Sequence, residues 1–254
     1  MLRRLPRLAG RARSSPAWRR LLAIVIALPA AALVIATPGA RLRAAVTRLL
    51  CRGLIALTGT PLSISGPTAA ARGGRVVVAN HASYVDALIV RAALPGRLFF
   101  VAKRELADSR ALRLLLERVG CEFVERSNHA RGLSDLERIR ERAAAGETVV
   151  AFPEGTFAHG AGLRGFRVGA FMVAVQAGIE VVPVAIRGSR RLLRGSSLWP
   201  RPSRLALVAG EPIAPAGNDW NAALSLRDAA RAHILAHCDE PDLAPGGGGV
   251  AGNL

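Results

Sequence analysis

Aromatic side chains are scarce in this chain, at 4% of 254 residues, and Lys103 is its single lysine. The 35 basic residues outnumber the 18 acidic ones, so the formal net charge is +17 and almost all of the positive charge is arginine. This charge predicts an anionic partner, either nucleic acid or an acidic membrane surface. No basic stretch is interleaved with aromatic residues that would stack on bases, so the sequence favours the membrane surface and disfavours nucleic acid.

Cysteine is also rare, and its placement excludes several site types. The three cysteines are odd in number and far apart, so neither a disulfide framework nor a zinc cluster is expected, and a reducing compartment is favoured. His233 and His237 are four residues apart, but such a pair on an amphipathic helix favours a structural role, and we expect no metal. The chain lacks the Gly-x-Ser-x-Gly elbow of serine hydrolases, the Walker loop and the dinucleotide fingerprint.

Charge is missing altogether from Leu21 to Ala40. Twenty helical residues rise about 30 Å, which is the thickness of a bilayer core. An arginine-rich segment (1–20) precedes this run, and Pro29 interrupts it. The chain should turn at Pro38-Gly39, and a second apolar stretch follows this turn. We expect a membrane-associated helical hairpin over residues 21–62.

The second apolar stretch carries Arg41, Arg48 and Arg52, whose spacing places them on one helical face, as in an interfacial helix. A single span with a cytoplasmic basic end would put the rest of the chain outside, away from substrates in the cytosol. We therefore favour a re-entrant hairpin on the cytoplasmic face of the cell membrane. A signal peptide and a buried core helix are the alternatives.

From Arg75 onward, short apolar strands alternate with helical patterns, which predicts an α/β fold: one domain with a central, mostly buried sheet flanked by helices and preceded by the membrane anchor. We expect a catalytic domain over residues 63–216, then a C-terminal helix and glycine-rich tail over 217–254. Predicted strands are Val76–Ala79, Leu98–Ala102, Glu122–Val124, Thr148–Phe152, Val181–Ile186 and Leu205–Val208. Predicted helices are Asp86–Ala93, Ser109–Val119, Leu133–Ala145, Val168–Ala177 and Trp220–His237.

His81 and Asp86 follow the first predicted buried strand, at a strand end where sites in α/β folds gather. On one continuous helix the two side chains would lie about 140° apart, so a break between them is required. Ser83 with Asp86 three residues later fits a capping box, which predicts Ser83 as the N-cap. An aspartate that orients the imidazole makes His81 a general base; in the alternative, Asp86 only caps its helix.

A second polar cluster, Glu154-Gly155-Thr156, follows another apolar strand. Gly155 allows close backbone approach to a ligand, and Glu154 can accept hydrogen bonds from substrate hydroxyls or hold an arginine. Arg126 follows a strand and Arg167 precedes a helix, as arginines of a phosphate site do. The alternatives are an ordinary turn for the first cluster and solvated surface charges for the two arginines.

These segments, in order, resemble the four sequence blocks of the glycerolipid acyltransferase family typified by 1-acylglycerol-3-phosphate O-acyltransferases. The blocks are Asn80-His81 with Asp86, Gly120 to Arg126, Phe152 to Thr156, and Val182-Pro183-Val184, and the resemblance covers Arg75 to Gly188. It implies an acyl-CoA or acyl-carrier-protein donor as co-substrate, no cofactor, and direct transfer without an acyl-enzyme.

By this resemblance His81 is the base, Asp86 orients it, and Arg126, Glu154 and Gly155, with neighbouring Thr156 and Arg167, bind a lysophospholipid acceptor. The expected reaction converts lysophosphatidic acid to phosphatidic acid; another lysolipid acceptor, or a non-catalytic lipid-binding protein, is the alternative. Two positions depart from the family pattern. Phe157 stands where an arginine is usual, and Arg167 replaces a usual lysine, so Arg164 or Arg167 would supply the missing charge.

Overall fold

The computed structural model describes most of the chain between Ala17 and Ala244. The described residues are 17–68, 73–124, 129–155, 160–193, 200–201 and 203–244. Two residues predicted to bind substrate, Arg126 and Thr156, lie outside the described residues, as does Phe157.

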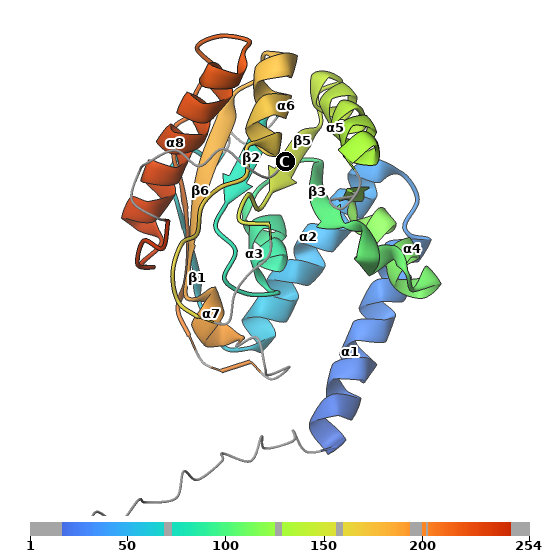
Figure 1. The fold of residues 1–254 in the computed structure, drawn as a ribbon. Helices are drawn as coiled ribbons and strands as arrows, with labels where there is room; N and C mark the ends of the chain where they lie inside the picture. The colour runs from blue at the N-terminus through green and yellow to red at the C-terminus, as the bar shows by residue number, and fades with distance from the viewer. Residues whose placement is uncertain are drawn as a thin grey trace, which may run out of the picture.

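Within the described residues, seven strands form one central sheet in the order β1-β7-β6-β2-β5-β3-β4 (Figure 1). Neighbouring strands run parallel except β6 and β7, which are antiparallel, so the sheet is mixed. The central strand β2 is fully buried, as its run of β-branched residues predicts. The strands are β1 (Leu62–Ser65), β2 (Val76–Ala79), β3 (Leu98–Lys103), β4 (Cys121–Val124), β5 (Thr148–Ala151), β6 (Val181–Arg187) and β7 (Leu205–Ala209).

Helices cover both faces of this sheet (Figure 1). One hydrophobic cluster joins the sheet to α2 and α3, and a second joins the opposite face to α5, α6 and α8. The C-terminal helix is thus part of the core. The helices are α1 (Ala17–Ala36), α2 (Ala40–Leu57), α3 (Asp86–Ala93), α4 (Arg110–Val119), α5 (His129–Ala144), α6 (Gly169–Ala177), α7 (Ser189–Leu192) and α8 (Trp220–His237), with a 3-10 turn, η2 (Arg104–Ala107).

The elements predicted from the sequence are confirmed, with ends displaced by at most one residue except in α5, which begins four residues earlier than expected. The strand β1 is not predicted, because residues 42–62 read as one apolar stretch. Three of its four residues are exposed, so this edge strand lacks the apolar pattern of the inner strands. It is placed by pairing with β7, from Leu62 opposite Leu205 to Ser65 opposite Val208.

The two N-terminal helices turn at the predicted point, where Gly39 has a φ of 67° that glycine adopts readily. α1 continues through Pro29, so the expected interruption at this proline is absent. Among the helices that the structure describes, none combines the length and the apolar character needed to cross a membrane. Association of α1 and α2 with a membrane stays a prediction.

α2 packs into the core, since Cys51 and Ile55 are buried in the same cluster as α3. Arg48 donates from Nε to the carbonyl of Ala92 at 3.2 Å and from Nη2 to that of Ala93 at 3.1 Å. These carbonyls end α3 and lack helical partners, so the guanidinium caps them. The prediction that Arg48 lines an interfacial face together with Arg41 and Arg52 is therefore wrong; Arg41 and Arg52 are exposed, as predicted.

Candidate active site

The ends of β2 and β5 form the candidate site. The strands are parallel, with Val78 opposite Ala151, so His81 and Glu154 each follow this pair by three residues. The backbone N–H of His81 donates to Glu154 Oε1 at 2.7 Å. The structure thus brings the first and second predicted clusters into direct contact at the carboxyl edge of the sheet, where ligands bind in α/β folds.

His81 and Asp86 form a direct pair, as their spacing predicts. His81 Nδ1 lies 2.9 Å from Asp86 Oδ2, and the same oxygen accepts the backbone N–H groups of Ala82 and Ser83 at 2.7 Å each. The carboxylate is fully buried, whereas the imidazole is 18% exposed. Three donors on one oxygen fix the carboxylate, and the carboxylate in turn fixes the ring through Nδ1.

The start of α3 differs from the predicted capping box. Asp86 reaches back to the backbone N–H of Ser83, as the box requires. The hydroxyl of Ser83, however, donates to the carbonyl of Leu193 at 2.9 Å, and Val85 occupies the N-cap position, with Asp86 as the first helical residue. Ser83 is therefore not the N-cap. Its side chain instead connects the active-site turn to the segment after α7.

Two further side chains hold the turn, and the sequence gives neither of them a role. The ring of Phe152 stacks on the imidazole of His81, with centroids 4.4 Å apart and an interplanar angle of 23°. Asn80 is buried and exchanges two hydrogen bonds with the backbone of Ile186, at 2.7 and 3.0 Å. The sequence signals for them are an amide directly before the histidine and an aromatic residue directly after β5, the strand that pairs with β2.

Glu154 is a buried bridge between two segments of backbone. Its Oε1 accepts the N–H of His81, and its Oε2 accepts the N–H of Arg164 at 3.1 Å and lies 3.6 Å from Arg164 Nε. Desolvation by burial raises the pKa of Glu154, while these two backbone donors and Arg164 oppose the rise. The carboxyl group contacts an arginine, which was one of the two roles expected for it.

Gly155 and Arg167 lie against each other beside Glu154. Gly155 has a φ of 83°, and a Cβ built on it would approach Arg167 Nε to 2.8 Å, so a larger residue would displace the guanidinium. The backbone N–H of Arg167 donates to the carbonyl of Pro153 at 2.9 Å. Arg167 is exposed, which leaves its charge accessible at the rim of the site.

The histidine pair on α8 lies apart from these residues. The rings of His233 and His237 stack with centroids 4.4 Å apart, and His237 Nδ1 contacts the carbonyl of His233 at 2.8 Å. Burial, and then His237, lower the pKa of His233. Across the described ranges, no three histidine, cysteine, aspartate or glutamate side chains are grouped to hold a metal ion.

Comparison with known proteins gives the context for this geometry. Residues 62–187 match the model of the family described as Acyltransferase. The 1-acyl-sn-glycerol-3-phosphate acyltransferase of Neisseria meningitidis is 32% identical over 151 residues, which are 59% of this chain and 57% of that protein. The human 1-acyl-sn-glycerol-3-phosphate acyltransferase alpha is 35% identical over 112 residues, 44% of this chain and 40% of that protein. This chain therefore spans about half the length of these curated relatives.

A solved structure has the same fold. It is the crystal structure of the 1-acyl-sn-glycerophosphate (LPA) acyltransferase of Thermotoga maritima, with a TM-score of 0.68. The alignment covers 85% of this chain and 90% of that one, at 19% sequence identity. The mixed sheet with flanking helices is thus an established architecture.

Proposed function

We propose that this chain, whose residues 62–187 match the acyltransferase family model, transfers a fatty acyl group from a thioester to the free hydroxyl of a lysophospholipid. The proposed acceptor is lysophosphatidic acid and the product phosphatidic acid, since relatives from two kingdoms carry that activity in their names. The observation that carries the proposal is the His81–Asp86 pair, with its buried carboxylate and partly exposed imidazole, at the carboxyl edge of the sheet.

In the proposed reaction, Asp86 holds His81 through Nδ1 and stabilises the imidazolium that forms. His81 Nε2 takes the proton of the acceptor hydroxyl as its oxygen attacks the thioester carbonyl. The tetrahedral intermediate then collapses, the C–S bond breaks, and the leaving sulfur takes the proton from His81. The products are the acylated lipid and a free thiol, so the histidine ends in its starting protonation state and no acyl-enzyme is needed.

The residues beside His81 divide into two roles in this proposal. Arg167, exposed against Gly155, binds the acceptor phosphate, because a guanidinium forms charge-assisted hydrogen bonds with phosphate oxygens. Glu154 acts as a positioning residue, since both its oxygens accept backbone donors. Arg126 and Thr156 remain predicted substrate-binding residues.

The protein is also proposed to attach to the cytoplasmic face of an anionic membrane through α1 and α2. Arg41 and Arg52 on α2 are exposed, and cations of this kind interact with acidic headgroups. Large apolar side chains on the same two helices are between 51% and 72% exposed: Val25, Leu28, Leu33, Leu42, Leu49 and Leu57.

Vesicle sedimentation tests this attachment. Deletion of residues 1–62 would remove the buried Cys51 and Ile55, so point variants are preferable. Leu28→Asp and Leu57→Asp should release the protein from vesicles of phosphatidylglycerol and phosphatidylcholine, whereas Leu243→Asp, also at an exposed leucine, should not. Sedimentation of all three variants like the unaltered protein would refute the role of these helices.

Product analysis tests the function. The purified protein is incubated with lysophosphatidic acid or other lysophospholipids, each with acyl-CoA or acyl-carrier protein, and products are identified by mass. The proposal expects phosphatidic acid as the main product and release of one thiol per acyl chain transferred. Binding of lysolipid without any product would show a non-catalytic lipid-binding protein, and product from a different lysolipid alone would refute the assigned acceptor.

A further inference from the structure

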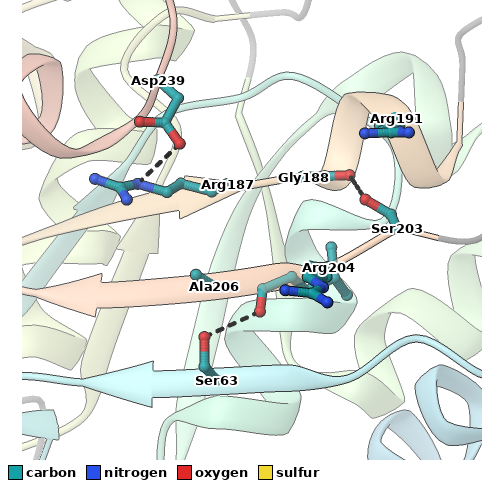
Figure 2. Close-up of a pocket in the computed structure, with 9 residues that line it drawn as sticks. Ser63, Arg187, Gly188, Arg191, Ser203, Arg204, Ala206 and Asp239 are labelled. Carbon is teal, nitrogen blue, oxygen red and sulfur yellow. Dashed lines mark hydrogen bonds and ion pairs between the residues drawn. The ribbon is translucent and has the colours of Figure 1, made fainter.

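A pocket of about 550 Å³ lies at the carboxyl end of β6, the strand that pairs with β2. Figure 2 shows that β6, β7, β1 and α7 contribute its walls. Arg187 at the end of β6 and Arg204 just before β7 enter from neighbouring strands, and Arg191 enters from α7. The lining residues are Ser63, Arg187, Gly188, Arg191, Ser203, Arg204, Leu205, Ala206 and Asp239.

The pocket carries an excess of positive charge. Arg187 Nε lies 3.3 Å from Asp239 Oδ2 and also donates to the carbonyl of His237, so its charge is balanced. Within the described ranges, no carboxylate lies within 4.0 Å of Arg191 or Arg204. One acidic side chain thus faces three arginines, and a bound anion would neutralise positive charge that remains.

The backbone around the pocket is fixed. Ser203 Oγ donates to the carbonyl of Gly188 at 2.9 Å, and Ser63 Oγ donates to that of Leu205 at 3.2 Å (Figure 2). Gly188 has a φ of 79°, and a Cβ there would meet the carbonyl oxygen of Arg204 at 2.0 Å. The close approach of these segments requires glycine, so the backbone that lines this open pocket is held in place.

The pocket and the His81 site share one edge of the sheet. β6 pairs directly with β2, and Asn80 and Ile186 exchange two hydrogen bonds across this pair. Ser83, in the active-site turn, bonds to Leu193 immediately after α7. Strand spacing of about 4.8 Å puts β7 roughly 10 Å from β2, which an extended pantetheine arm can cover.

We propose that this pocket binds the nucleotide phosphates of a coenzyme A donor, with Arg191 and Arg204 as phosphate ligands. The inference rests on the proposed acyl transfer and deepens it, because it selects acyl-CoA over a carrier protein, which has no nucleotide. The cavity volume lies within the range of about 300–1,000 Å³ that small-ligand pockets occupy. Asp239 also lines the pocket, and its negative charge repels a phosphate, which limits the affinity for the nucleotide.

Donor kinetics with two thioesters test the site. Arg191→Gln and Arg204→Gln should each raise KM for acyl-CoA about tenfold, the loss of one charge-assisted phosphate contact. KM for an acyl-pantetheine with the same chain, which lacks the nucleotide, should not change, nor should KM for lysophosphatidic acid. Arg113→Gln, at an exposed arginine on α4, is the matched control and should leave all three values unchanged. Asp239→Asn should lower KM for acyl-CoA, because it removes the opposing charge.

Calorimetry with 3′,5′-ADP provides a readout that does not need turnover. Both arginine variants should bind this nucleotide about tenfold more weakly than the unaltered protein. Unchanged nucleotide binding, or an equal rise of KM for both thioesters, would overturn the inference. Loss of binding to phosphatidate vesicles with nucleotide binding intact would also overturn it, since the pocket would then hold a lipid headgroup. If no lysolipid is acylated but the arginines control nucleotide binding, the proposed acyl transfer fails while the pocket assignment stands.

Discussion

Asp86→Asn separates catalysis from helix capping at the proposed base. In the structure one buried oxygen of Asp86 accepts His81 Nδ1 and the backbone N–H groups of Ala82 and Ser83. Asparagine keeps an acceptor for the two backbone donors, so the turn should form. Replacing charge-assisted by neutral hydrogen bonds costs about 1 kcal/mol for each backbone donor, which gives a loss of about 2 kcal/mol in the free energy of unfolding.

The expected effect on the reaction is larger than the effect on stability. Without the carboxylate the imidazolium is not stabilised and the tautomer of His81 is not fixed, so kcat should fall by about 10³–10⁴. This corresponds to about 4–5.5 kcal/mol in the barrier. The assay combines initial rates of labelled acyl transfer with urea denaturation of the same preparation.

Asp135→Asn is the matched control, because Asp135 is a buried aspartate on α5 that pairs with Arg138. It should lose stability with little change in kcat. If Asp86→Asn lost the same stability and kept kcat within about twofold, Asp86 would only cap its helix, and the assigned base would lose its partner.

Two further predictions concern the residues that hold the site and its support. Burial raises the pKa of Glu154, so its carboxyl group adds most to stability below the unfolded pKa of about 4.3 and less as the pH rises through the raised value. The quantity to follow is the unfolding free energy of the unaltered protein minus that of Glu154→Gln, measured by urea titrations at several pH values. This difference should fall as the pH rises from about 4 and then level off. A rise over this interval would contradict burial as the cause of the raised pKa. Arg48→Met should lower the unfolding free energy by about 2–3 kcal/mol, since the carbonyls of Ala92 and Ala93 lose their cap, whereas Arg52→Met, at an exposed position, should change it by less than about 0.5 kcal/mol. Equal effects of the two arginine variants in thermal or urea unfolding would show that Arg48 does not support α3.

The sequence predicts the parts of the fold that depend on local pattern. The inner strand Val76–Ala79 is a continuous run of apolar residues, and Asp86–Ala93 shows helical spacing, so both appear as expected. A continuous helix would keep His81 and Asp86 apart, so their spacing predicts a break between them. This break brings the two side chains into contact. The outcome at Ser83 differs, since its hydroxyl bonds to Leu193, 110 residues away in the chain.

Features that depend on long-range pairing are not available from local pattern. Glu154 meets the backbone of His81 only because β2 and β5 pair in parallel at one register. The sequence periodicity places Arg48 on one helical face with other arginines. It does not predict that carbonyl groups of α3 lie against this arginine and accept its hydrogen bonds. The pocket lined by Arg187, Arg191 and Arg204 lies where β1, β6 and β7 meet, and the sheet order makes these strands neighbours. The local signal for this pocket is the segment from Arg187 to Arg191, which follows a strand.

The rate of labelled acyl transfer by His81→Ala tests the central claim most directly. His81 contacts Asp86 and stacks on Phe152 but is partly exposed, so circular dichroism should show a folded variant. With lysophosphatidic acid and acyl-CoA, the account predicts phosphatidic acid from the unaltered protein and a rate at least about 10³-fold lower from the folded variant. A folded His81→Ala protein that forms phosphatidic acid at the unaltered rate would contradict the assignment of His81 as the base.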